Sequence, residues 1–239
     1  MRPVESPVSD STNRILMALP AVSRANLWPL LSRLQLAKGH VLYQMGAEIS
    51  HLYFVESGLV ALAKPMRDGR IAEIAAIGSE GIVTPTGVFG ADRAAMESIV
   101  EIPSTVLRID RHDFRERLLA DREFLTLVQQ YAGFLMSQLT QTAACNILHR
   151  IEERCCRWLL IAHDSVFGDR FSITHDFIAT LLGVRRAGVQ AAAAALQKAG
   201  LISYARGKVT VSDRAGLEKA ACECYATIQI ELEELFSAS

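Results

Sequence analysis

The sequence contains no apolar run that reaches the roughly 18 residues needed to cross a bilayer. Residues 1–11 are polar and lack the apolar segment of a secretory signal. There is no excess of basic residues either, because 25 Lys and Arg stand against 26 Asp and Glu, a formal net charge of -1. A global attraction to nucleic acid or membrane is thereby excluded, so any such signal must be local. We expect a cytoplasmic protein without a membrane partner.

Cysteine is scarce, and its five residues show no disulfide framework, which argues against a secreted protein. Cys155-Cys156 and Cys222-x-Cys224 lack the four-ligand, C-x₂-C-like spacing of a structural zinc site. We therefore interpret both pairs as small buried hydrophobic residues, although a metal or redox role for closely spaced cysteines stays open. No metal and no cofactor is predicted.

Signatures of catalysis are absent as well. The six histidines form no H-x-H pair, which a metal-dependent β-roll enzyme would need. The sequence has neither a nucleophile–base signature nor a phosphate-binding loop. Acidic pairs such as Glu152-Glu153 lie on predicted helices and are interpreted as solvated faces. We expect a protein that is not an enzyme.

Hydrophobic residues make up 50% of the 239 residues and charged residues 21%, which excludes general disorder. Residues 1–12 are expected to form a flexible arm. Residues 13–34 have helical apolar spacing, with Trp28-Pro29 starting or kinking the second piece. From residue 36 to 109, short β-rich runs alternate with glycines at about ten-residue spacing, which predicts a compact β-sandwich or barrel.

A long helix is predicted after Asp121. Phe124, Val128, Tyr131 and Leu135 follow one another by four, three and four residues, which is typical of a coiled-coil seam. This stripe could pack on the β-domain of its own chain. We expect it to serve a partner helix as well, because the seam is long for a compact β-domain, and we predict that these four residues join two copies of the chain.

The segment from residue 173 to 202 has the most specific pattern in the chain. Ala179 lies four residues before Gly183, and Val189 lies six residues after it. A small residue lets two helices approach, a glycine takes the tight turn, and a β-branched residue fills the core behind it. Thr174 is a candidate N-cap for the first helix. The pattern predicts a helix-turn-helix.

The second helix of this motif begins with polar side chains that could enter a major groove. Two β-rich runs follow, 201–204 and 208–211, and predict a hairpin wing. Residues 172–214 hold six Lys or Arg and two Asp or Glu, a local net charge of +4. The predicted DNA-binding residues are Thr174, Arg185, Arg186, Gly188, Gln190, Tyr204, Arg206 and Lys208.

Taken together, these segments resemble the Crp/Fnr family of transcription regulators over nearly the whole chain. The stretch GAEISHLYFVESGLVALAKPMRDGR is similar to the two glycine-punctuated hairpins of the family's cyclic-nucleotide-binding-like β-roll. Five further motifs occur in the order of a branch of that family: IGSEGIV, RWLLIAHD, LGVRRAGV, LQKAGLISYARG and DRAGLEKAACECY.

The resemblance implies an α+β fold with an N-terminal jelly-roll-like β-roll, flanking helices, a long dimerisation helix and a C-terminal winged helix-turn-helix. We expect the sensor domain at 13–120, the dimerisation helix at 121–145 and the DNA-binding domain at 146–239. The implied function is transcription regulation by a homodimer on a two-fold site in double-stranded DNA, with RNA polymerase as a further partner.

Departures from the family concern its ligands. Cyclic-nucleotide binders of the family have Gly-Glu-Leu and Arg-Ser-Ala stretches around the ribose phosphate. Here Thr84-Pro85-Thr86 and Arg93-Ala94-Ala95 stand in their place. Thr84, Thr86 and Arg93 are therefore weak candidates for an effector pocket, and we expect an effector other than a cyclic nucleotide. The family's oxygen sensors use N-terminal cysteines for an iron–sulfur cluster, and no cysteine precedes Cys145.

Two other functions are compatible with parts of the sequence. A cyclic-nucleotide-responsive activator would keep the same architecture. A β-roll ligand-binding module or a cupin-type enzyme would belong to another class, and the absent H-x-H pair and the basic segment speak against it. Ala187 and Ala191 replace the glutamate and arginine that many relatives use to contact bases, so a different operator is expected.

Overall fold

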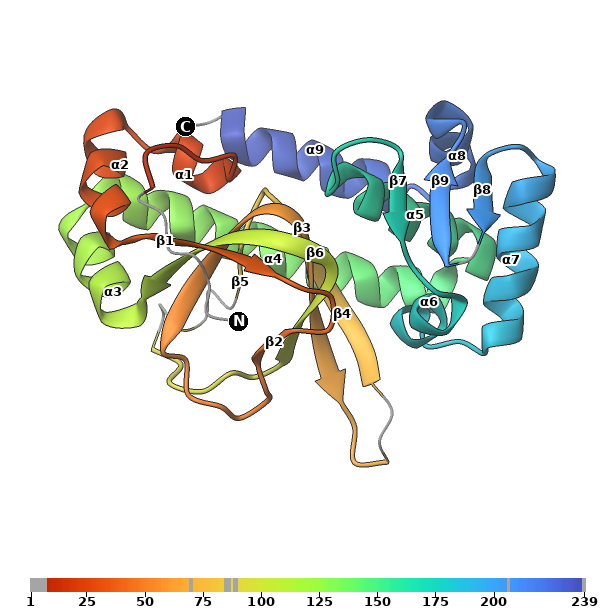
Figure 1. The fold of residues 1–239 in the computed structure, drawn as a ribbon, viewed down its shortest axis with the longest axis horizontal. Coiled ribbons are helices and arrows are strands. Elements are labelled where there is room, and N and C mark those ends of the chain that lie inside the picture. The colour runs from red at the N-terminus through yellow and green to blue at the C-terminus, as the bar shows by residue number, and fades with distance from the viewer. Residues whose placement is uncertain (1–7, 69–70, 84–86, 88–89, 206, 238–239) are drawn as a thin grey trace.

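The structure is a computed structural model of the chain, and it describes residues 8–68, 71–83, 87, 90–205 and 207–237. The fold is α+β, as predicted. A β-roll and a smaller C-terminal unit lie at the two ends of one long helix (Figure 1). Within the described residues, no helix combines the length and apolar character that a membrane span requires.

Short helices open the described chain: α1 Arg14–Ala18, α2 Ala21–Leu27 and the 3-10 helix η1 Trp28–Leu30. The fully buried Asn13 caps α1, because its side chain accepts from Leu16 N–H. Its amide also donates to the carbonyls of Val55 and Gly81, each at 2.9 Å, and so attaches α1 to the roll. The helical pattern expected to reach residue 34 ends earlier, since Leu34 lies in a strand paired with Val106.

The β-roll is a six-stranded antiparallel sheet in the order β1-β6-β3-β4, with β2 on β6 and β5 on β3. Two pairs of short runs expected from the sequence are continuous in the structure and form the long strands β3 and β6. The strands are β1 Ser32–Leu36, β2 Val41–Tyr43, β3 His51–Pro65, β4 Ile71–Ile77, β5 Ile82–Val83 and β6 Glu97–Asp110.

Gly58 lets β3 continue through an irregular point of the sheet. The register of β3 against β6 shifts on both sides of it, and its φ is +83°. A Cβ at this position would clash with the backbone of Pro103 and Ser104. Its N–H donates to the Ser165 carbonyl of the C-terminal unit at 2.8 Å. Only glycine combines this positive φ with the close approach of Pro103 and Ser104 without strain.

Helix α3 (Arg111–Ala120) follows the roll, and α4 (Arg122–Leu148) runs behind the roll in the view of Figure 1. The large apolar side chains of α4 point into the roll of the same chain. Phe124 lies edge-on to Phe114 with ring centroids 5.2 Å apart. The hydroxyl of the buried Tyr131 donates to the Ile82 carbonyl at 3.2 Å. α4 is thereby part of the roll's hydrophobic core.

The C-terminal unit combines helices with a three-stranded sheet in the order β7-β9-β8. Its core is built around α5, with Trp158 and Leu160 buried among residues of the two following helices. The elements are α5 Ile151–Asp164, β7 Arg170–Ser172, α6 His175–Leu182, α7 Arg186–Lys198, β8 Ile202–Ala205, β9 Lys208–Val211, α8 Arg214–Ala220 and α9 Cys224–Ser237.

The last helix, α9, leaves this unit and returns along α4 toward α1 (Figure 1). Its buried residues Ile228, Leu232 and Leu235 share a core with α1, α4 and the roll. Arg14 of α1 pairs with Glu233 at 3.0 Å. The end of the segment expected to form the DNA-binding domain therefore packs against the first half of the chain.

The roll and the C-terminal unit meet where β4 faces α5 and α6. Trp158 Nε1 of α5 donates to Glu73 Oε1 of β4 at 3.4 Å, and the other carboxyl oxygen of Glu73 is buried without a partner. Burial raises the pKa of Glu73 to about 8. Burial also raises the pKa of the neighbouring Glu101 to about 7. Near neutral pH the Glu73 carboxyl is therefore mainly neutral, and the Glu101 carboxyl is neutral in a large fraction of the molecules.

These shifts make the stability of the contact depend on pH. A carboxyl whose pKa is higher in the folded chain than in the unfolded chain binds more protons when folded, so stability falls as pH rises between the two values. For Glu73 that window runs from its ordinary 4.5 to about 8. The unfolding free energy should lose up to about 1.4 kcal/mol per pH unit there for each such group.

Glu73→Gln should remove the contribution of one titrating group to the slope of unfolding free energy against pH. The amide stays neutral at every pH, and its oxygen can still accept a hydrogen bond from Trp158. Denaturant unfolding of the wild type and the variant at several pH values measures the slope. The exposed Glu116 on α3 gives a matched control, and Glu116→Gln should leave the slope unchanged. Equal slopes in the wild type and Glu73→Gln would contradict the assignment.

Candidate nucleic-acid interface

The helix-turn-helix forms where the sequence predicts it. Thr174 Oγ1 accepts from the Phe177 N–H at 3.2 Å and caps α6. α6 ends at Gly183, whose φ of +63° lies in the left-handed region that favours glycine. Ala179 and Val189 are both buried in the core that α6 and α7 share. Each residue of the predicted motif thus has the local role expected of it.

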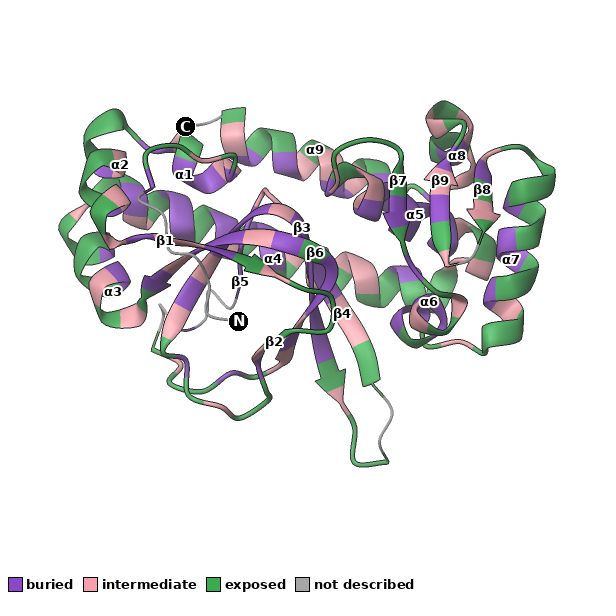
Figure 2. Cartoon of the chain, in the orientation of Figure 1, coloured by how far each residue is buried: buried purple, intermediate pink, exposed green. Residues whose placement is uncertain are grey.

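Helix α7 has a buried face and an exposed face. The buried residues are Val189, Ala192, Ala193 and Leu196. The exposed residues are Arg186, Ala187, Gln190, Ala191, Ala194 and Ala195, followed by Gln197 and Lys198 at the end of the helix. Figure 2 shows the outer side of α7 exposed at the edge of the molecule. The outer face therefore presents polar side chains near its N-terminus, mainly methyl groups in its middle and polar side chains again at its C-terminal end.

Two arginines stand at the start of α7. Arg186 Nη1 lies 2.9 Å from Asp176 Oδ2 of α6, and both side chains are largely exposed. An exposed ion pair of this kind contributes about 0–1 kcal/mol, so Arg186 could exchange its partner at little cost. Arg185 is the exposed N-cap residue of α7. Both guanidinium groups are thus exposed at the N-terminal end of α7.

Gly188 and Tyr204 have internal contacts. A Cβ at Gly188 would lie 3.1 Å from Ile151 Cδ1, so this glycine allows α7 to approach α5. The Tyr204 hydroxyl donates to the Ile173 carbonyl at 2.9 Å. Its ring stacks on His175 with centroids 4.2 Å apart, and burial lowers the pKa of that histidine, which keeps it neutral. Both residues are half-buried and have structural roles within the motif, and their predicted contact with DNA stays a prediction.

The wing is the hairpin of β8 and β9, which β7 extends to three strands. Lys208 is exposed at the start of β9 and pairs with Ala205 in the strand register. Arg206, the other predicted wing contact, lies outside the described residues. The wing therefore places at least one cation beside the exposed face of the helix-turn-helix.

The candidate effector residues are only partly described. Thr84 and Thr86 lie outside the described residues. Arg93 is exposed, and its Nη1 donates to the Gly46 carbonyl at 2.8 Å. Its guanidinium is thus engaged by a backbone carbonyl at the surface of the roll.

Two family models match the sequence. The Crp-like helix-turn-helix domain matches residues 153–220, and the cyclic nucleotide-binding domain matches residues 33–121. The chain belongs to the Crp/Fnr family. It is a Crp-like transcription regulator with a DNA-binding helix-turn-helix and a domain of the cyclic-nucleotide-binding type. No curated protein sequence matches the chain.

Solved structures share the Crp/Fnr fold. FixK2 from Bradyrhizobium japonicum is 15% identical, with 80% of this chain and 98% of that chain covered and a TM-score of 0.69. A CRP-family regulator from Thermus thermophilus is 22% identical, with 78% and 95% covered and a TM-score of 0.66. The c-di-GMP-responsive regulator CLP from Xanthomonas campestris is 18% identical, with 80% and 99% covered and a TM-score of 0.65.

The predicted dimer seam of this Crp/Fnr protein requires a correction. Phe124, Val128, Tyr131 and Leu135 are all buried within a single chain, against its own roll. The alternative in which the stripe packs on its own β-domain is the one that the structure bears out. Large apolar side chains at helical spacing show that one face of a helix is buried, but not whether a second chain or the chain's own sheet covers it. Here the chain's own sheet covers it.

A second stripe lies on the exposed side of α4. Its residues also follow one another by four and three positions, and most are small or apolar. They are Gln129, Gly133, Met136, Thr140, Ala143 and Ile147. Met136 is 61% exposed and Ile147 is 81% exposed. We call this set the outer stripe of α4. The sequence gives only a weak signal for it, because Met136 and Ile147 are its only large apolar residues.

All five cysteines are buried, as expected, and the structure adds a grouping that the sequence did not reveal. Cys222 and Cys224 precede and begin α9, and the structure brings them to Cys145 and His149 at the end of α4. Neither pair of neighbouring cysteines has the spacing of a metal site by itself. The two further candidate ligands, Cys145 and His149, lie more than 70 residues earlier in the chain than Cys222. The i, i+4 spacing of Cys145 and His149 was the available signal.

Proposed function

We propose that this Crp/Fnr protein binds a two-fold DNA operator as a homodimer, with α7 of each chain in a major groove. The observation that carries the proposal is the exposed face of α7, which begins with two arginines and lies beside the cationic wing. Contact of the bound dimer with RNA polymerase is proposed from the family alone. No catalytic role is proposed.

Base contacts are assigned to the start of α7. Arginine pairs in a bidentate manner with guanine, and glutamine pairs in the same way with adenine. Arg186 is supported by its weak exposed pair with Asp176, while Arg185 and Gln190 are its exposed neighbours. The exposed alanines that follow offer only methyl groups, which suit the methyl group of thymine.

Arg186→Ala should weaken operator binding by about 1–3 kcal/mol and relax the preference at one position of each half-site. Lys208→Ala, the matched control on the wing, should weaken specific and random DNA alike and lower the salt slope by about one. Fluorescence anisotropy over a salt series measures both effects. An equal loss on both DNAs for Arg186→Ala would make Arg186 a phosphate contact.

The homodimer is assigned to the outer stripe of α4. Alternating steps of four and three residues are those of a helix that packs along a second helix. A Cβ at Gly133 would meet no atom of its own chain within 4 Å, yet glycine inside a helix costs about 1 kcal/mol relative to alanine. Close approach of a second α4 explains why so small a residue stands there.

Ala143→Glu should convert the dimer to a monomer, because it places a charge between the two helices while the fold of each chain is unaffected. Leu135→Ala is the matched control on the opposite face. It should lower the unfolding free energy by about 2–5 kcal/mol and leave the dimer intact. Sedimentation equilibrium and denaturant unfolding separate the two effects. A monomeric wild type at micromolar concentration would contradict the proposal.

We further propose an effector other than a cyclic nucleotide. The roll interior is filled by the chain's own apolar residues, among them Val60, Leu62, Val100 and Leu135. Arg93, which could pair with the phosphate of a cyclic nucleotide, is exposed and donates a hydrogen bond to the Gly46 carbonyl. In the sequence, proline stands where the ribose hydroxyl would need an acceptor, and the loss of that partner costs about 1–3 kcal/mol.

Calorimetry with cyclic AMP and cyclic GMP should therefore show no binding at micromolar concentrations. The test includes Arg93→Ala as a companion variant, because the arginine is the one described residue that matches the family's phosphate contact. A micromolar dissociation constant in the wild type that is lost in Arg93→Ala would overturn this proposal and favour a cyclic-nucleotide-responsive regulator.

A further inference from the structure

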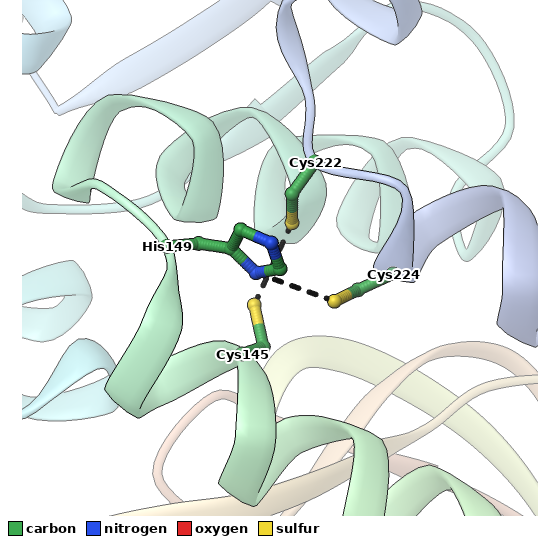
Figure 3. A group of neighbouring side chains, drawn as sticks. All are labelled: Cys145, His149, Cys222 and Cys224. Atoms are coloured by element: carbon green, nitrogen blue, oxygen red, sulfur yellow. Dashed lines mark hydrogen bonds between the residues drawn. The ribbon is translucent and has the colours of Figure 1, made fainter.

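Four side chains from two distant segments of the chain lie close together where α4 ends and α9 begins (Figure 3). Cys145 and His149 come from the end of α4, and Cys222 and Cys224 come from the start of α9. One possible ligand atom from each lies within 4.8 Å of the others. The Sγ atoms of Cys145 and Cys222 are 3.5 Å apart, and Cys224 Sγ is 3.5 Å from His149 Nδ1.

The surroundings of these cysteines differ from those of ordinary buried cysteines. Cys145, Cys222 and Cys224 form a cluster of their own, separate from the larger hydrophobic cores. The remaining two, Cys155 and Cys156, lie among aliphatic and aromatic side chains of the C-terminal unit. A role as small buried hydrophobic residues therefore explains Cys155 and Cys156, but it does not explain the separate cluster of three cysteines.

The spacing of the four atoms suits one metal ion. Zinc binds thiolate sulfur at about 2.3 Å in a tetrahedral arrangement, which places ligand sulfurs about 3.8 Å apart. The separations of 3.5 Å and the outer limit of 4.8 Å leave room for a single ion. An iron–sulfur cluster would need space for several atoms between its ligands.

We propose that Cys145, His149, Cys222 and Cys224 bind one Zn²⁺ ion in a tetrahedral Cys₃His site. Three thiolates and one imidazole are a donor set of structural zinc centres. Nδ1 of His149 faces the sulfurs, and its Nε2 lies 3.2 Å from Glu223 Oε1. A carboxylate on the second ring nitrogen is the usual partner of a zinc-bound histidine, because it orients the ring.

Buried positive charge next to the site supports the same assignment. Zn²⁺ with three thiolates has a net charge of about -1. Arg154 and Arg157 of α5 are both buried, and the Nε of each has no hydrogen-bond partner. Both lie near enough to Cys145 to interact with it electrostatically. A zinc–thiolate centre would provide a nearby anion for these buried guanidinium groups.

The experiment starts from the full-length wild type, purified with a reductant and without chelators. Metal analysis by mass spectrometry should find about one zinc per chain, the stoichiometry of a single tetrahedral site. After removal of the zinc, Co²⁺ should give the intense visible bands of a tetrahedral site and a thiolate charge-transfer band in the near ultraviolet. Both measurements are made without DNA, so a failure of operator binding leaves the result intact.

Variants test the individual ligands. Cys145→Ser, Cys222→Ser, Cys224→Ser and His149→Ala should each reduce the zinc content and change the Co²⁺ spectrum. Cys155→Ala is the matched control, and it should retain the full zinc content. Circular dichroism checks that each variant is folded.

Glu223→Gln keeps all four ligands and gives a second, milder test. It should hold zinc at the same stoichiometry but with an affinity about 10- to 100-fold lower, because the partner of His149 is weakened. Glu234→Gln, an exposed change further along α9, should leave the affinity unchanged.

Three results would overturn the proposal. The first is a reduced wild type that retains no zinc after incubation with Zn²⁺ and dialysis. The second is a zinc content that falls as much in Cys155→Ala as in the ligand variants. The third is a Cys145–Cys222 disulfide in protein kept under reductant, which would make the pair a redox centre instead.

Discussion

The packing of α4 against the β-roll is the contact on which the rest of the architecture depends. Phe124 and Tyr131 place one face of the helix inside the roll's core. With 27 residues, α4 is about 40 Å long and extends beyond the sheet to the C-terminal unit. Its flank is covered by α9, which ties the end of the chain to the same core. One rigid helix therefore joins the sensor part, the C-terminal helix and the segment that leads to α7.

A helix that is buried on one face has only its opposite face left for a partner. In the proposed dimer this assigns the outer stripe to the two-fold axis, where small residues such as Gly133 and Ala143 allow the helices to approach closely. The recognition helices of such a dimer must lie about 34 Å apart to reach successive major grooves. That separation depends on the direction in which α5 leaves α4, because Ile151 of α5 contacts α7 at Gly188.

Local requirements were predictable from the sequence and long-range ones were not. The helix-turn-helix was predicted because Ala179, Gly183 and Val189 meet needs set within a few residues. The seam of α4 was assigned to the wrong partner, since periodicity identifies an apolar face but not what covers it. Cys145 meets Cys222 only because α9 folds back, and ligand spacing along the chain gives no sign of that return.

The proposed metal centre lies at the joint between the two halves of the molecule. His149 is the C-cap of α4, and α5 begins at Ile151. Ile147, the last residue of the outer stripe, falls between the ligands Cys145 and His149. A metal that joins this turn to the start of α9 would therefore fix the end of the dimer helix and the direction of α5 together. In the proposed dimer, the distance between the two recognition helices would then depend on metal loading, because the proposed ligands hold the joint that sets it.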